Sequence, residues 1–176
     1  EYELYNQAGT KLTFNAYLAV VGFLNNNSWF GESESFLGDD TDTWLEVGFE
    51  PQLSLEAPLG KGTFFGKLSA VFTDTFGDDA SGLTIGADDT HDASIEQGHV
   101  GWRMSDLFPG LTDDVFSIAI GRQDYTIGTG LLIADGGSDG GEDGGWYLAM
   151  RKAFQETVIA SLKSNRLVAE GFFLKN

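Results

Sequence analysis

Apolar and polar residues alternate along the thirteen residues from Leu45 to Ala57. Every odd position in this stretch is apolar or proline, and every even position is polar or glycine, with glutamate at three of them. A period of two places the two sets on opposite faces of one extended strand. A strand of a soluble protein usually has about five or six residues, whereas a tilted strand that crosses a bilayer needs about 9–11. The pattern therefore predicts a strand with one apolar face and one wet, charged face, as in a membrane β-barrel.

Similar alternation predicts further strands on both sides of this one. Seven strands are predicted in all, over residues 11–24, 43–57, 63–75, 94–105, 115–125, 155–163 and 166–175. Ser164 and Asn165 are predicted to form a two-residue turn between the last two strands, and Trp146–Phe154 is a candidate for an eighth strand. The predicted fold class is all-β: an antiparallel, up-and-down transmembrane β-barrel, of which this chain forms a partial barrel of seven or eight strands.

The connections between the predicted strands alternate in length. Residues 25–42, 76–92 and the segment after Tyr125 are long and rich in acidic residues or glycine. Residues 58–62, 106–114 and 164–165 are shorter. Long loops at one end of the strands and short turns at the other end are typical of bacterial outer-membrane barrels.

Composition agrees with an all-β protein of one domain. The chain of 176 residues has 24 glycines, 13% aromatic residues, no cysteine and a net charge of −17. The apolar runs are too short for a transmembrane helix, and the sequence that starts at Glu1 has no signal-peptide pattern, as expected of a processed mature protein. We treat residues 1–176 as one barrel segment that continues beyond residue 176, because seven strands leave two open edges and single-chain bacterial barrels have an even strand number.

Several charged residues are predicted to face the lumen of this barrel. They are Lys11, Glu46, Glu50, Glu56, Lys67, Arg103, Arg122 and Asp124. The three glutamates could form a cation-selective wall, or they could be solvated charges that the basic residues neutralise. Arg122 shares the alternation phase of the apolar Ile120, so either it lies at the membrane rim or a bulge turns it inward.

A glycine-rich acidic segment is a candidate calcium site. Its carboxylates are Asp135, Asp139, Glu142 and Asp143. Calcium takes six to eight oxygen ligands, and glycine lets backbone carbonyls turn toward the ion. The alternative is a solvated, flexible acidic loop, because the spacing does not match an EF-hand. No other cofactor is predicted, and no metal site is firmly predicted.

Catalytic motifs are missing from the sequence. It contains no His-Glu-x-x-His and no phosphate-binding glycine loop. The two histidines, His91 and His99, are too few for a catalytic arrangement of their own. We therefore predict no catalytic residue and no enzymatic activity.

One stretch carries a resemblance to a known family. The strand Phe116–Tyr125 ends in Gly-Arg-Gln, and a Gly/Asp-rich loop, the sequence Ala153–Thr157 and a closing hairpin follow. This order resembles the amino-terminal part of the alginate-export family of outer-membrane porins, best over Phe116–Asn176. The resemblance implies a large single-chain barrel that lets a polar solute or polysaccharide pass through the outer membrane. It also implies that Arg122 faces the lumen, with Arg151 and Lys152 as further candidates by position.

These observations predict a porin-like channel in the outer membrane of a Gram-negative bacterium. Polar solutes or polysaccharide would diffuse through a water-filled lumen, although glutamates on the wall would repel a polyuronate. The expected partners are outer-membrane lipid, lipopolysaccharide and the solute, with a homotrimer as the expected assembly. Nucleic acid is not expected, because a phosphate backbone needs a basic surface. The alternative is a soluble secreted β-sandwich that acts as a calcium-dependent carbohydrate-binding module.

Overall fold

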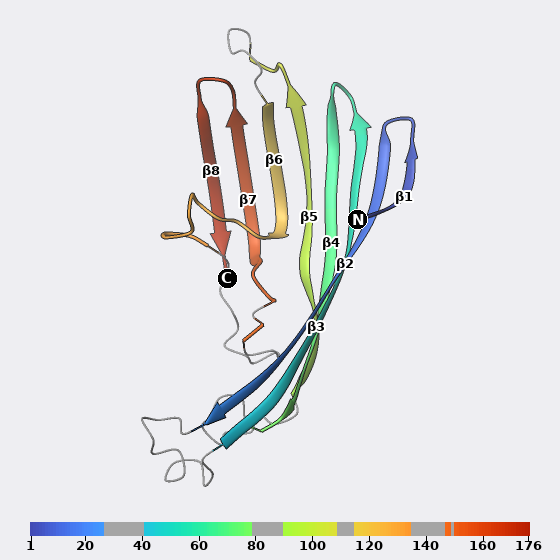
Figure 1. The fold of residues 1–176 in the computed structure, drawn as a ribbon. Coiled ribbons are helices and arrows are strands. Elements are labelled where there is room, and N and C mark those ends of the chain that lie inside the picture. The colour runs from blue at the N-terminus through green and yellow to red at the C-terminus, as the bar shows by residue number, and fades with distance from the viewer. Residues whose placement is uncertain (27–40, 79–89, 109–114, 135–146, 149) are drawn as a thin grey trace.

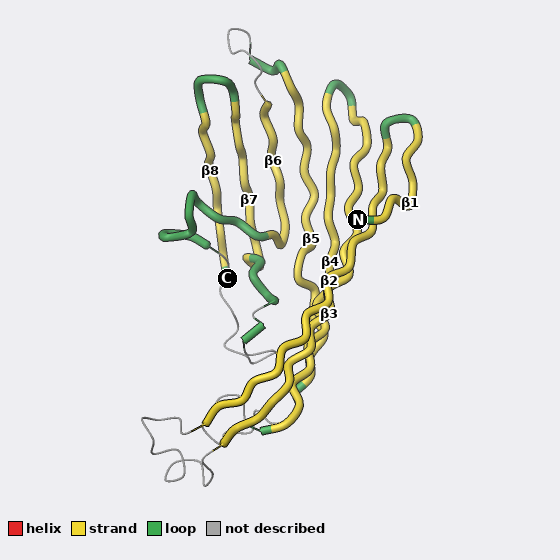
Figure 2. The backbone as a smooth tube through the Cα atoms, viewed as in Figure 1, coloured by secondary structure: helices red, strands yellow, loops and turns green. Residues whose placement is uncertain are grey.

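One antiparallel sheet contains every strand of this computed structural model, which describes residues 1–26, 41–78, 90–108, 115–134, 147–148 and 150–176 (Figure 1). The strands are β1 (Tyr2–Gln7), β2 (Thr10–Asn26), β3 (Thr41–Leu59), β4 (Gly62–Gly77), β5 (His91–Ser105), β6 (Val115–Gln123), β7 (Phe154–Lys163) and β8 (Val168–Lys175). Each strand pairs with the next in chain order (Figure 2). The all-β, antiparallel, up-and-down architecture is thus confirmed, with eight strands. Among the described residues, none belongs to a helix long and apolar enough to cross a membrane.

The eighth strand lies at the start of the chain, so the prediction of a strand at Trp146–Phe154 is wrong. Residues 147–148 form a turn, and residues 150–153 have no regular secondary structure. β1 instead pairs with β2 across a tight turn at residues 8–9. The register between these two strands shifts over residues 3–5, and such a bulge breaks the alternation that would have revealed β1.

The turn between β7 and β8 is longer than predicted. Lys163 pairs with Val168, so the connection covers residues 164–167 instead of Ser164 and Asn165 alone. The backbone N–H of Ser164 donates to the Leu167 carbonyl at 2.8 Å. The Ser164 hydroxyl in turn accepts the N–H of Leu167 at 3.1 Å. This local hydrogen bonding by serine stabilises the wider turn.

The predicted alternation of loop lengths is confirmed. Residues 8–9, 60–61, 106–114 and 164–167 make the connections at one end of the sheet. Residues 27–40, 78–90 and 124–153 make those at the other end, and they are longer. Figure 1 shows the strand ends that the shorter connections join at the top of the view.

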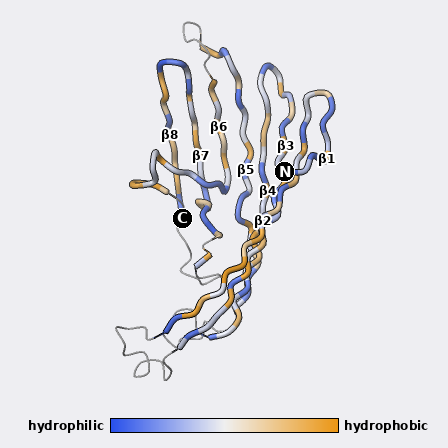
Figure 3. Tube along the Cα trace, in the orientation of Figure 1, coloured by the Kyte–Doolittle hydropathy of each residue, from blue (hydrophilic) through white to orange (hydrophobic). Residues whose placement is uncertain are grey.

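The two faces of the sheet differ in polarity, because hydrophobic and hydrophilic residues alternate along the strands, which Figure 3 colours by hydropathy. The apolar face carries Leu12, Phe14, Leu18 and Val20 of β2, Leu45, Val47, Phe49 and Leu53 of β3, Phe64, Leu68, Ala70 and Phe72 of β4, and Ile95, Val100 and Trp102 of β5. The polar face carries Lys11, Thr13 and Asn15 of β2, Glu46, Glu50, Gln52, Ser54 and Glu56 of β3, Lys67, Ser69, Thr73 and Thr75 of β4, and Gln97, His99 and Arg103 of β5. The strand register thus confirms that the apolar and the polar residues of these strands lie on opposite faces of the sheet.

Burial is the reverse of what a soluble protein shows. Among the described residues, most of the buried side chains are polar, including Glu46, Thr75, Glu96 and Thr157. Large apolar side chains on the apolar face are exposed instead, with Leu18 at 64%. In soluble proteins, charged residues are almost never fully buried unless they are paired, and extended exposed apolar patches are rare. The apolar face of the sheet is therefore exposed, and most of the buried side chains are polar.

Gly121 is a position where the fold requires glycine. Its φ is 129°, which L side chains rarely adopt. A Cβ atom there would contact the Gly98 carbonyl oxygen and lie 2.8 Å from Cα of His99 on β5. We expect Gly121→Ala to lower the free energy of unfolding by at least about 1–3 kcal/mol, the usual cost of a strained backbone residue. The urea midpoint measures this, and Gly171→Ala is the control, since no atom lies within 4 Å of its Cβ position. Equal midpoints for the two variants would contradict the prediction.

Candidate functional site

The last part of the connection between β6 and β7 covers part of the polar face. We call residues 147–148 and 150–153, just before β7, the returning segment. Its backbone is bound by the Glu46 carboxylate of β3, whose side chain is 0% exposed. Oε2 of Glu46 accepts the N–H groups of Tyr147 and Leu148, each at 2.9 Å. The indole N–H of Trp44 donates to the other oxygen at 3.1 Å. Hydrogen bonds to a charged group are the stronger kind, so Glu46 holds this end of the segment.

A second carboxylate, Glu96 of β5, binds the other end of the returning segment. Its Oε1 accepts the N–H of Lys152 at 2.6 Å and that of Ala153 at 2.8 Å. The register between β4 and β5 shifts beside this residue, since Gln97 pairs with Ser69 whereas Ile95 pairs with Ala70. Glu96 is the extra residue of this bulge, and both Glu96 and Gln97 are buried. The bulge thus places two consecutive polar side chains in the polar interior.

Apolar contacts complete the docking of the segment. A Cβ atom on Gly48 would collide with the Met150 sulfur, so a glycine is needed for Met150 to approach β3 this closely. The Tyr147 ring lies 4.9 Å from Phe23 and 5.6 Å from Trp44, measured between ring centroids. The polar side of β2 turns apolar toward its end, and Phe23 lies in that part of the strand. The returning segment covers this apolar patch.

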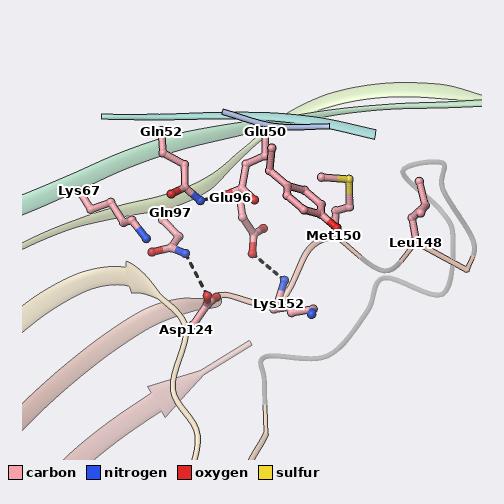
Figure 4. A pocket seen from close by; sticks show the side chains of 10 residues that line it. Glu50, Gln52, Lys67, Glu96, Gln97, Asp124, Leu148, Met150 and Lys152 are labelled. Carbon is pink, nitrogen blue, oxygen red and sulfur yellow. Dashed lines mark hydrogen bonds between the residues drawn. The ribbon is translucent and has the colours of Figure 1, made fainter. Parts of the chain in front are cut away.

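The segment and the sheet enclose a cleft of about 310 Å³ (Figure 4). It is lined by Tyr17, Glu50, Gln52, Lys67, Glu96, Gln97, Asp124, Leu148, Met150 and Lys152. These residues come from β2, β3, β4, β5, the start of the β6–β7 connection and the returning segment. The cleft is therefore bounded by the sheet on one side and by the β6–β7 connection on the other.

Amides and carboxylates form pairs inside the cleft. The side-chain amide of Gln97 donates to Oδ2 of Asp124 at 3.0 Å, a bond drawn in Figure 4. The amide of Gln52 donates to Oε1 of Glu50 at 2.8 Å. Each glutamine amide also brings its own carbonyl oxygen and a second N–H to the cleft. The cleft thus offers both donors and acceptors at neighbouring positions.

The other predicted lumen residues on these strands form ion pairs or line the cleft. Lys11 pairs with Glu1 at 3.1 Å, and Arg103 pairs with Glu56 at 2.8 Å. Glu46 is covered by the returning segment, so of the three glutamates only Glu50 lines the cleft. Each of the three glutamates thus has a different environment, and the cation-selective wall stays a prediction.

The remaining candidates lie around the β6–β7 connection. Arg122 is half-buried, and its Nε donates to the Glu96 carbonyl at 2.9 Å, beside a shift in register at the end of β6. Asp124 and Lys152 line the cleft, and Arg151 is a half-buried residue of the returning segment. Arg122 is thus hydrogen-bonded to the β5 bulge, and its side chain is not part of the cleft lining.

The segment after β6 is held against β8 by Tyr125. Its hydroxyl donates to Oε2 of Glu170 at 3.1 Å, and its ring lies 5.0 Å from that of Phe172. Burial, the hydrogen bond to Glu170 and the negative charge of that carboxylate all raise the pKa of the Tyr125 hydroxyl. The hydroxyl therefore remains protonated, as its donor role requires.

Sequence reasoning missed Tyr17, Gln52, Glu96 and Gln97 as cleft residues. The adjacent Glu96 and Gln97 interrupt the alternation of β5, and two consecutive polar residues in such a strand are a signal of a bulge. The predicted calcium ligands Asp135, Asp139, Glu142 and Asp143 lie outside the described residues. Within the described part of the chain, no three histidine or acidic side chains are grouped so that they could hold a metal ion.

We found no protein-family model and no curated protein that matches this chain. The resemblance to alginate-export porins therefore stays a prediction.

Proposed function

We propose that this sheet forms part of the wall of a β-barrel channel in the outer membrane of a Gram-negative bacterium. Its apolar face would contact membrane lipid and lipopolysaccharide. Its polar face would line a water-filled lumen through which polar solutes or polysaccharide diffuse. The single observation that carries this proposal is the reversed burial, with polar side chains inside and large apolar side chains exposed. Strand length adds support, because β2, β3 and β4 are each long enough to cross a bilayer.

Closure of the barrel is part of the proposal. The described sheet has two edges, β1 and β8. In lipid, backbone groups at such edges must be hydrogen-bonded, since each unsatisfied group costs several kcal/mol. We propose that further strands pair with both edges, and the homotrimer remains a prediction.

The returning segment narrows the proposed lumen. It crosses the polar face of β3 and β5, where Glu46 and Glu96 bind its backbone. A solute that moves along this face would pass the cleft beside the segment. The channel would therefore discriminate between solutes at this point, whereas an unobstructed lumen would not.

The alternative, a soluble sandwich that binds carbohydrate with calcium, has less support. In a sandwich, the apolar face of one sheet packs against a second sheet. The described strands all belong to one sheet, and its apolar face is exposed. A soluble form would expose an apolar patch that few soluble monomers carry.

Single cysteine substitutions test which face contacts lipid, because the natural chain has no cysteine. We expect an environment-sensitive dye at Leu53→Cys to report an apolar surrounding in lipid vesicles. The same dye at Ser54→Cys should report water and remain accessible to a soluble quencher. Leu53 and Ser54 are neighbours in β3 and point to opposite faces, so the pair forms its own control.

The same two cysteine variants also distinguish the channel from the soluble sandwich. A channel protein should fractionate with outer membranes and show the difference only when lipid or detergent is present. Equal water accessibility at both positions, in a protein recovered without detergent, would refute the channel.

A further inference from the structure

The cleft beside the returning segment has a mixed inventory of polar groups. Three carboxylates, two amides and two ammonium groups line it. Two of the carboxylates already accept side-chain amides, those of Glu50 and Asp124, and Glu96 accepts two backbone N–H groups. Among the described residues, the ammonium groups of Lys67 and Lys152 form no ion pair. The cleft is thus a mixture of charged donors and charged acceptors, without a dominant sign.

This balance disfavours a ligand that carries many charges of one sign. A polyanion would meet the carboxylates of Glu50, Glu96 and Asp124, and like charges at close range repel. A simple cation would be repelled by the ammonium groups of Lys67 and Lys152. A hydroxyl group both donates and accepts, so several hydroxyls can satisfy adjacent carboxylates, amides and ammonium groups together. The polar groups therefore fit a neutral solute with many hydroxyls.

The apolar part of the lining fits the same class of ligand. Tyr17 lies on the polar face but is 56% exposed, so its ring is accessible beside the cleft. Leu148 and Met150 contribute aliphatic surface from the returning segment. A sugar ring has C–H faces that can cover an aromatic ring while its hydroxyls form hydrogen bonds. At about 310 Å³, the cleft is at the small end of the range for ligand pockets, about 300–1,000 Å³.

We propose that this cleft is a binding site for a neutral polyhydroxylated solute, such as a small uncharged sugar, and not for a polyuronate. Tyr17 would contact the sugar ring, and the Gln97–Asp124 and Gln52–Glu50 pairs would bind its hydroxyls. Lys67 would donate to a further hydroxyl. This inference rests on the proposed channel function and names the class of solute that the channel favours.

The test uses the complete barrel that contains this sheet, in planar lipid bilayers and, separately, in detergent micelles. Maltose should reduce the ion current in a concentration-dependent way, and a uronate oligomer of similar length should reduce it less. Calorimetry in micelles should detect maltose binding. Tyr17→Ala should raise the half-blocking maltose concentration about tenfold, since loss of an aromatic anchor commonly costs at least this factor. Asn15→Ala, on the same face of β2 and outside the cleft, should leave it unchanged.

The outcomes separate the two proposals. Ion current without any effect of maltose, and no heat of binding, would overturn the sugar site and leave the channel standing. Stronger block by the uronate oligomer than by maltose would also overturn it. Maltose binding in micelles that Tyr17→Ala weakens, without any ion current in bilayers, would support the site and refute the channel. Lys67→Met gives a second variant in case Tyr17→Ala does not fold.

Discussion

Replacing Glu46 with alanine should release the Tyr147–Leu148 end of the returning segment and increase single-channel conductance several-fold. The carboxylate accepts backbone N–H groups from Tyr147 and Leu148. A hydrogen bond to a charged group contributes about 1.5–3 kcal/mol. Loss of two such bonds, at about 3 kcal/mol or more together, shifts the ratio of docked to released segment by at least about 100-fold. The released backbone can hydrogen-bond to water, and the lumen beside β3 would widen.

Two further variants sharpen this prediction. Glu56→Ala removes a carboxylate from the same face of β3, but Glu56 pairs with Arg103 and does not bind the segment. Its conductance should therefore change much less. Glu46→Gln retains one acceptor oxygen and should give an intermediate conductance. If Glu46→Ala inserts into bilayers with wild-type conductance, the returning segment does not narrow the pore.

The strands were predictable because their signal is local. The alternation in β3 requires only that neighbouring residues face opposite sides, which holds for any extended strand. The predicted range 43–57 differs from the observed β3 by two residues at each end, where strands extend beyond the alternating part. The same reasoning missed β1, because a bulge within a short strand removes the alternation.

The cleft was not predictable because its contacts are distant in the sequence. The bonds from Glu46 to the segment span about a hundred residues, and those from Glu96 span more than fifty. The apolar residues Tyr147, Leu148 and Met150 resemble part of a strand when considered alone. In the structure, they instead cover the apolar patch at the end of β2 and the surface of Gly48. The apolar end of β2 and the apolar residues of the returning segment look unrelated in the sequence, but in the structure they contact each other.

Replacing Leu18 with arginine should prevent much of the protein from inserting into lipid. Leu18 lies near the middle of β2, on the apolar face, and is 64% exposed. An arginine on the lipid side near the midplane of a bilayer costs about 2–4 kcal/mol. If the apolar face stayed exposed to water, an arginine at this position would change stability by no more than about 0.5 kcal/mol. An apolar face in lipid and an apolar face in water therefore predict different results for this one substitution.

Asn15→Arg provides the matched control, because Asn15 is exposed on the polar face of the same strand. We expect it to insert as the wild type does, since the new charge would project into water. The fraction that migrates in the folded, heat-modifiable form after mixing with lipid vesicles at increasing urea measures the difference. Equal midpoints for Leu18→Arg and Asn15→Arg would mean that the apolar face does not contact lipid. A selective loss for Leu18→Arg would assign that face to the membrane, and with it the polar face, the returning segment and the cleft to the lumen.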